Sequence, residues 1–179
     1  MVNATVFQQF VSGVIMRKIS FLLFVMIGMQ LMGCKTAEST IAIRDFKNHD
    51  PSAADHILFL DFEITRRGKK TEVVELVNAV SGRGKMKNLV APVQSPYQIR
   101  VLPTYSSDRP ETEMAFEHPL YRSVEVASQD GRLSKHDLSA TQGTLSIRVQ
   151  EDKALEKIEL YSITPEKGKT KIYTLNLKQ

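Results

Sequence analysis

The chain has 179 residues, with 24 lysines and arginines against 20 acidic residues, one cysteine and no tryptophan. A single cysteine excludes an internal disulfide and any metal site built from several thiolates, so the folded state must rest on a hydrophobic core. The formal net charge of +4 is too small to indicate nucleic-acid binding. The length suits one domain of ordinary size.

The segment over residues 16–34 has the three parts of a secretory signal. Arg17 and Lys18 form its positive start, and an apolar run without charge follows over residues 19–31. A run of about 13 residues suits a cleaved signal and is shorter than the roughly 20 residues that a spanning helix needs. The uncharged residues 1–15 precede this signal, so we expect translation to start at the methionine that follows them.

The end of this segment resembles the lipobox of bacterial lipoproteins, in which apolar and small residues precede a cysteine, here Leu31-Met32-Gly33-Cys34. The resemblance implies removal of residues 1–33 as a signal peptide and fatty acyl groups such as palmitate on Cys34. It also implies a short tether over residues 34–39 and a lipid-anchored protein of the bacterial cell envelope. Lys35 stands where an aspartate would retain such a protein at the inner membrane. This favours the outer membrane, on its periplasmic face or at the cell surface.

Two alternatives leave the cysteine without lipid. An ordinary secretory signal could end nearby, with Cys34 incidental. A permanent membrane anchor would have to include residues 1–15, and Arg17 and Lys18 would then lie in hydrocarbon. Each such residue costs about 2.5–3.5 kcal/mol at the centre of a membrane helix, which disfavours the permanent anchor.

From Thr40 onward, apolar and polar residues alternate in short segments separated by turns. The clearest segment covers residues 56–65, where four apolar residues fall on one face: Leu58, Leu60, Phe62 and Ile64. Asp61 and Glu63 fall on the other face. A period of two residues is typical of a strand with one buried face. We therefore expect the apolar set in the core and the two acids in solvent.

Similar segments continue to the end of the chain. A turn at Gly68 leads into a returning strand over residues 71–80, whose Leu76 we expect in the core. Further strands are predicted over residues 40–46, 89–93, 97–102, 114–118, 122–127, 144–150, 155–163 and 170–177. This spacing predicts an all-β fold, an antiparallel immunoglobulin-like β-sandwich of about seven to nine strands. We expect one domain over residues 40–179, and a small β-barrel is the alternative.

The histidines give no metal-binding pattern. None lies three or four residues from another, and no His-x-His pair exists among His49, His56, His118 and His136. We therefore expect surface or loop histidines and no metal site.

The sequence predicts no catalytic residues and no cofactor. The densest acidic group consists of Glu111, Glu113 and Glu117 next to His118. On a regular strand the histidine would point away from these carboxylates, so we expect solvated surface rather than an acid–base pair. A Gly-x-Ser-x-Gly motif is absent.

The least regular stretch covers residues 92–119 and is punctuated by prolines. Binding residues concentrate on loops of this kind. We therefore place the candidate recognition surface at this stretch and its flank, with Tyr97, Tyr105, Arg109 and Tyr121.

The prediction from sequence is a non-enzymatic, membrane-anchored envelope lipoprotein that binds a protein or another envelope component. The alternatives are a small hydrolase of envelope polymers and a carbohydrate-binding accessory module. Nucleic acid is not an expected partner.

Replacing the acyl acceptor tests the anchor. Cys34→Ser should abolish lipidation and block processing, because the chain has no other cysteine to carry the lipid. Metabolic labelling with a fatty-acid analogue measures this, and label retained on the variant would refute the anchor.

Overall fold

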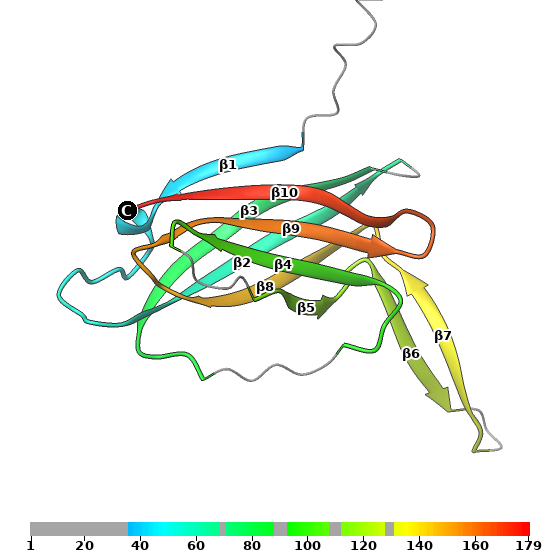
Figure 1. Ribbon diagram of the computed structural model, residues 1–179. Helices are drawn as coiled ribbons and strands as arrows, with labels where there is room; N and C mark the ends of the chain where they lie inside the picture. The colour runs from blue at the N-terminus through cyan, green and yellow to red at the C-terminus, as the bar shows by residue number, and fades with distance from the viewer. Residues whose placement is uncertain (1–35, 69–70, 88–92, 108–111, 128–130) are drawn as a thin grey trace, which may run out of the picture. The chain divides into compact units, whose positions relative to one another are not determined.

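The structure is a computed structural model that describes residues 36–68, 71–87, 93–107, 112–127 and 131–179 (Figure 1). The described residues form ten strands and a 3-10 turn at Ile43–Asp45. The strands are β1 (Ala37–Ala42), β2 (His56–Arg67), β3 (Thr71–Arg83), β4 (Gln98–Tyr105), β5 (Met114–Glu117), β6 (Tyr121–Ala127), β7 (Leu133–Ser139), β8 (Gln142–Gln150), β9 (Leu155–Thr164) and β10 (Gly168–Lys178).

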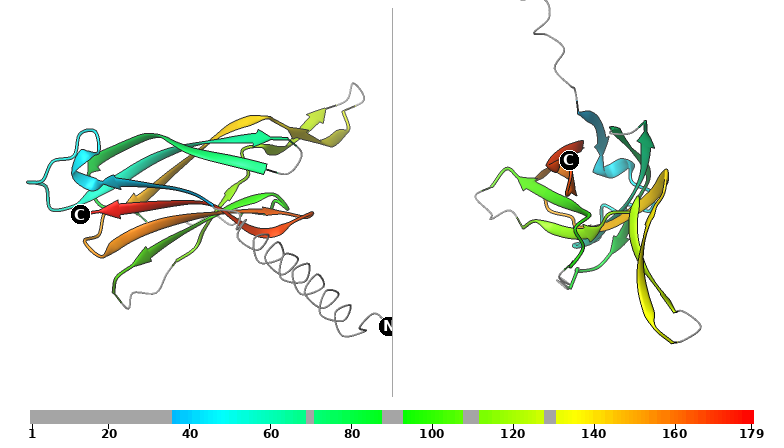
Figure 2. Two further views of the ribbon diagram at one scale, coloured as in Figure 1. Left: turned by 90° about the horizontal axis from the view of Figure 1, so that it is seen from above. Right: turned by 90° about the vertical axis from the view of Figure 1, so that its right-hand side faces the viewer.

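The strands form two packed sheets and a separate two-stranded ribbon. One sheet has the order β1-β10-β9-β4-β5, the second has the order β3-β2-β8, and β6 pairs with β7. All pairs are antiparallel except β1 with β10. The two larger sheets face each other across the core, and the end-on view shows that they do not close into a barrel (Figure 2). The predicted all-β sandwich is confirmed.

The alternation on β2 builds the core. Its four predicted core residues are fully buried: Leu58, Leu60, Phe62 and Ile64. They meet buried aliphatic residues of β4, β8, β9 and β10 from both sheets. Leu76 is only half-buried because β3 is an edge strand of its sheet. Asp61 and Glu63 are half-buried rather than exposed, and the Asp61 carboxylate accepts a hydrogen bond of 2.8 Å from the Asn78 side chain on β3.

The first strand begins earlier than the sequence pattern indicates. β1 starts at Ala37, inside the predicted tether over residues 34–39, and lies parallel to β10 from Tyr173 to Lys178. The strand predicted over residues 40–46 ends at Ala42, and the 3-10 turn follows. This turn buries Ile43, and Phe46 directly after it is buried too, at the end of the core. The polar residues around Ile43 and Phe46 in the sequence do not indicate that these two side chains cover the end of the core.

Two further predictions concern the position and the number of the strands. The strand predicted over residues 89–93 lies almost entirely outside the described residues. β7 is an unpredicted strand, and it raises the number above the expected seven to nine. Among the residues described, we find no helix with the length and apolar character needed to cross a membrane.

Truncating the core face should destabilise the domain strongly. Leu60→Ala and Phe62→Ala should each lower the free energy of unfolding by about 2–5 kcal/mol, as cavities in packed cores do. The matched control is Val77→Ala on β3, where the side chain is 54% exposed, and its effect should stay within about 0.5 kcal/mol. Denaturant titration measures all three, and equal losses would contradict the assignment of the core.

Candidate functional site

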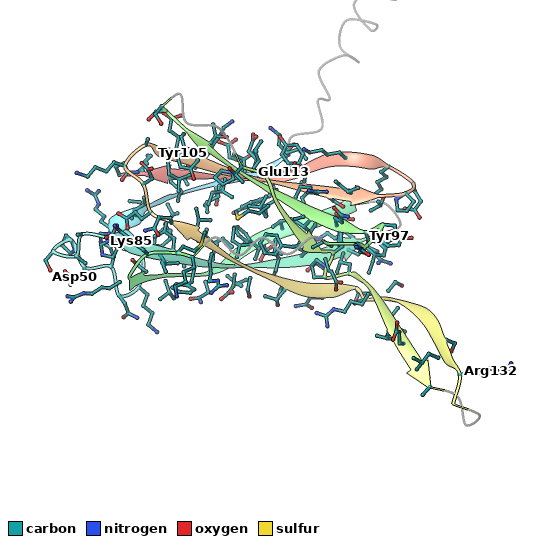
Figure 3. All side chains as sticks on the ribbon, turned by 60° about the horizontal axis from the view of Figure 1, so that its bottom comes forward. Asp50, Lys85, Tyr97, Tyr105, Glu113 and Arg132 are labelled. Carbon is teal, nitrogen blue, oxygen red and sulfur yellow. The ribbon has the colours of Figure 1, made fainter. Side chains whose placement is uncertain are left out.

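The predicted recognition residues do not form one surface. Tyr97 directly precedes β4 and Tyr105 ends it, and the labelled side chains lie at opposite ends of the strand (Figure 3). Eight residues of extended chain separate them by about 26 Å. Tyr121 joins Tyr97 at one end, with ring centroids 4.5 Å apart. Arg109 and the predicted lipidation site Cys34 lie outside the described residues.

The tyrosines near β6 are engaged within the protein. The rings of Tyr97 and Tyr121 stack at an interplanar angle of 17°. The Arg66 guanidinium lies over the Tyr121 ring at 4.8 Å from its centroid, and the Tyr97 hydroxyl donates to Glu166 at 3.3 Å. A sugar-binding platform needs an aromatic face open to solvent, and these contacts occupy the pair instead.

His118 lies in the turn between β5 and β6, as a predicted loop histidine would, but it is fully buried rather than at the surface. Its Nδ1 accepts the backbone N–H of Leu120 at 3.2 Å, which places the ring proton on Nε2. Nε2 then donates to the Ser162 hydroxyl at 3.1 Å and lies 3.5 Å from a carboxylate oxygen of Glu72. Gly143 makes this turn fit, because a Cβ there would lie 2.7 Å from the Pro119 carbonyl oxygen.

These three residues have the types of a hydrolytic triad but a different geometry. In a triad the acid binds the histidine nitrogen opposite the serine. Here Ser162 and Glu72 both face Nε2, and a backbone N–H occupies Nδ1. All three side chains are also buried. The arrangement is therefore a buried polar cluster around His118, in which the Glu72 carboxylate has an ion-pair contact and no hydrogen bond, and its serine is not exposed as a nucleophile.

The acidic group singled out in the sequence is dispersed. Glu113 forms ion pairs with Lys169 and with Arg100, the latter at 3.7 Å. Glu117 is exposed at the end of β5. Glu111 lies outside the described residues. The described members of the group are surface acids.

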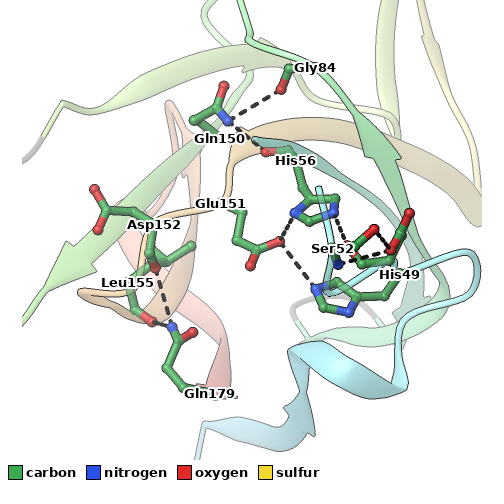
Figure 4. A network of polar contacts seen from close by, with 10 residues as sticks. His49, Ser52, His56, Gly84, Gln150, Glu151, Asp152, Leu155 and Gln179 are labelled. Atoms are coloured by element: carbon green, nitrogen blue, oxygen red, sulfur yellow. Dashed lines mark hydrogen bonds and ion pairs between the residues drawn. The ribbon is translucent and has the colours of Figure 1, made fainter. Parts of the chain in front are cut away.

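A second cluster joins His49, His56 and Glu151 at the end of the sandwich where β2 begins and β8 ends (Figure 4). His56 is buried and His49 half-buried, so the surface prediction is wrong for His56 as well. His56 Nδ1 lies 3.2 Å from Glu151 Oε2, and His49 Nε2 lies 3.5 Å from the same oxygen. The two imidazole rings stack with centroids 4.8 Å apart.

The sequence gives no local signal for this cluster. Glu151 follows β8 directly, and Gln150 at the end of β8 lies opposite Ile57 of β2. This pairing brings Glu151 next to His56, and its backbone N–H donates to the His56 carbonyl at 2.9 Å. Only a correct prediction of the β2–β8 register would have found it.

The β6–β7 ribbon projects from the sandwich as an arm (Figures 1 and 3). Its register pairs Arg122 with Leu138 and Val126 with Ser134, so one face carries Val124, Val126 and Leu138 together with Arg122 and Ser134. Val126 is 45% and Leu138 55% exposed, and Leu133 near the tip is 69% exposed. Three of the five exposed large apolar side chains in the described chain lie on this one hairpin.

Comparison with protein-family models, curated proteins and solved structures finds no match to this chain.

The buried Glu72 carboxyl should make stability depend on pH. Burial alone would raise its pKa, but His118, Ser162 and Lys167 outweigh burial and hold the pKa below its usual value. A carboxyl with a lowered pKa in the folded state stabilises the fold above the unfolded pKa of about 4.3. That contribution is lost as pH falls further, through the folded pKa. Glu72→Gln should therefore lower the free energy of unfolding at pH 7 by about 1–3 kcal/mol.

The difference between Glu72→Gln and the wild type should shrink as pH falls below about 4. Denaturant titrations between pH 7 and pH 3 measure it. Glu113→Gln is the control, because this surface acid should change stability by at most about 1 kcal/mol. A Glu72→Gln protein with the acid sensitivity of the wild type would contradict the assigned role.

Proposed function

We propose that this chain is an exported lipoprotein, anchored through Cys34 to a membrane of the bacterial envelope, most consistently the outer membrane. Its β-sandwich acts as a non-enzymatic binding module for another envelope protein. The anchor rests on the lipobox-like motif over residues 31–34. The binding role rests on the β6–β7 arm.

The observation that carries the proposal is the exposed apolar face of this arm. Val126 and Leu138 lie on that face, and Leu133 lies near the tip of the arm. An isolated two-stranded ribbon is only marginally stable in water. Exposed apolar side chains that gather on one element indicate an interaction site. A partner that covers the arm would bury these side chains and order the ribbon.

The backbone of the arm favours a protein over a lipid or a sugar as partner. Within the described chain, β6 and β7 pair only with each other, so each has one edge without a neighbouring strand. An extended segment of another protein can pair with such an edge. Hydrocarbon cannot satisfy unpaired backbone groups, which disfavours insertion into a bilayer. The exposed side chains are aliphatic, and the nearby tyrosines Tyr97 and Tyr121 stack on each other.

The hydrolase alternative has one observation in its favour, the proximity of Ser162, His118 and Glu72. Their burial and the shared use of Nε2 speak against a reactive serine. A binding module is therefore the better proposal.

Photo-crosslinking from the arm in intact cells tests the binding role. A photoreactive phenylalanine analogue at Val126 or Leu138 should give an adduct of discrete mass with another protein. The same probe at Val77 is the matched control, because that side chain is 54% exposed on the sandwich edge strand β3. A second change, Leu138→Ser, should weaken the adduct formed from position 126 at least about fivefold, the effect of losing about 1 kcal/mol of contact.

Three results would contradict the proposal. Adducts of equal yield from position 77 would mean non-specific contact. Adducts with phospholipid alone would identify a membrane-binding arm. Unchanged crosslinking from position 126 in the Leu138→Ser background would mean that this face of the arm is not part of the interface.

A further inference from the structure

We propose that His49, His56 and Glu151 bind a single divalent transition-metal ion, with zinc as the best-fitting ion. This inference is independent of the function proposed above, because it uses no residue of the β6–β7 arm. The site lies at the opposite end of the sandwich from that arm, beside the loop that carries Asp50 (Figures 3 and 4).

The spacing of the three donor atoms suits a common metal ligand. Zinc binds histidine nitrogens and carboxylate oxygens at about 2.0–2.2 Å in tetrahedral geometry, so neighbouring donors lie about 3.3–3.5 Å apart. The observed distances from Glu151 Oε2 are 3.2 Å to His56 Nδ1 and 3.5 Å to His49 Nε2. All three donor atoms lie within 4.8 Å of one another. An ion can therefore contact all of them with small side-chain movements.

The tautomer of His56 leaves the correct nitrogen available. Its Nε2 lies 2.8 Å from the backbone carbonyl oxygen of Asp50, which can only accept, so Nε2 carries the proton. Nδ1 then has a free lone pair on the side of Glu151, which it can donate to an ion bound between the two side chains. Histidines that bind metals usually donate their other N–H to a carbonyl or carboxylate in this way, which fixes the ring.

The surrounding contacts hold this arrangement in place. The Asp50 carboxylate accepts hydrogen bonds from Arg83 and from the backbone N–H of Ser52, the latter at 2.9 Å. The Gln150 side chain donates to the His56 carbonyl at 2.7 Å. The loop that carries Asp50 and the strand ends that carry His56 and Glu151 are therefore fixed before any ion binds.

Hydrogen bonds leave two donor atoms of this cluster unsatisfied. His49 Nε2 and Glu151 Oε2 are buried atoms without a hydrogen-bond partner. A neutral His49 with its proton on Nε2 would face Glu151 Oε2 at 3.5 Å, which is longer than an ordinary N–H···O hydrogen bond. A dication satisfies all three donors together.

The ligand set also selects the kind of ion. Two imidazoles and one carboxylate suit zinc and other late first-row transition metals, whereas calcium and magnesium require mostly oxygen ligands. Three protein ligands leave the fourth tetrahedral position for water or for a donor from a bound molecule.

Metal titration of the full chain purified in detergent and stripped with a chelator tests the site. Zinc should bind with one equivalent per chain and raise the melting temperature. Cobalt should give visible d–d absorption without a thiolate charge-transfer band, since no cysteine belongs to the site. His49→Ala and Glu151→Gln should each weaken zinc binding by at least about tenfold.

Matched controls separate the site from incidental binding. His136→Ala on β7 and Glu113→Gln near β5 remove the same residue types elsewhere and should leave the affinity unchanged. Circular dichroism checks that each variant is folded. If His49→Ala does not fold, the zinc affinity of Glu151→Gln decides the test. Absence of stoichiometric zinc binding by the wild type would overturn the proposal and leave a proton-linked ion pair. Binding that survives both substitutions in folded proteins would overturn it as well.

Discussion

The apolar face of β2 can be buried against β8 in only one register. Leu58, Leu60 and Phe62 lie opposite Val149, Ile147 and Leu145, and all six side chains are buried. A slip of one residue would turn Ser146 and Arg148 toward the core and the aliphatic residues toward solvent. The loss of buried apolar area therefore fixes this register. This register also determines where the cluster around His118 and the cluster of His49, His56 and Glu151 lie.

The same pairing determines what lies at each end of the sandwich. At one end, Gln150 lies opposite Ile57, and Glu151 therefore meets His56. At the other end, Ile64 lies opposite Gly143, whose missing side chain admits the Pro119 carbonyl and the buried turn around His118. The backbone N–H of Ala140 then donates to the Leu120 carbonyl at 2.8 Å, so the base of the β6–β7 arm is held against the sandwich. The arm itself projects beyond this anchored base.

The sequence predicts what depends on local periodicity and misses what depends on pairing. The alternation over Leu58 to Ile64 is sufficient to predict β2 and its buried face. β7 has few apolar residues and becomes a strand because it pairs with β6. His118 follows a glutamate and precedes a proline, and this context gives no sign that its ring is buried between Ser162 and Glu72. The four candidate recognition residues were grouped along the chain, yet an extended strand separates two of them by its full length.

The start of the fold has a consequence for a lipid-anchored protein. β1 begins at Ala37, three positions after Cys34, and three residues of chain span at most about 11 Å. An acylated Cys34 would therefore hold this sheet edge close to the bilayer surface. β1 runs from there toward the 3-10 turn and the loop that carries His49, parallel to β10. β1 and the 3-10 turn therefore connect the start of the described fold to the loop that carries one ligand of the histidine cluster.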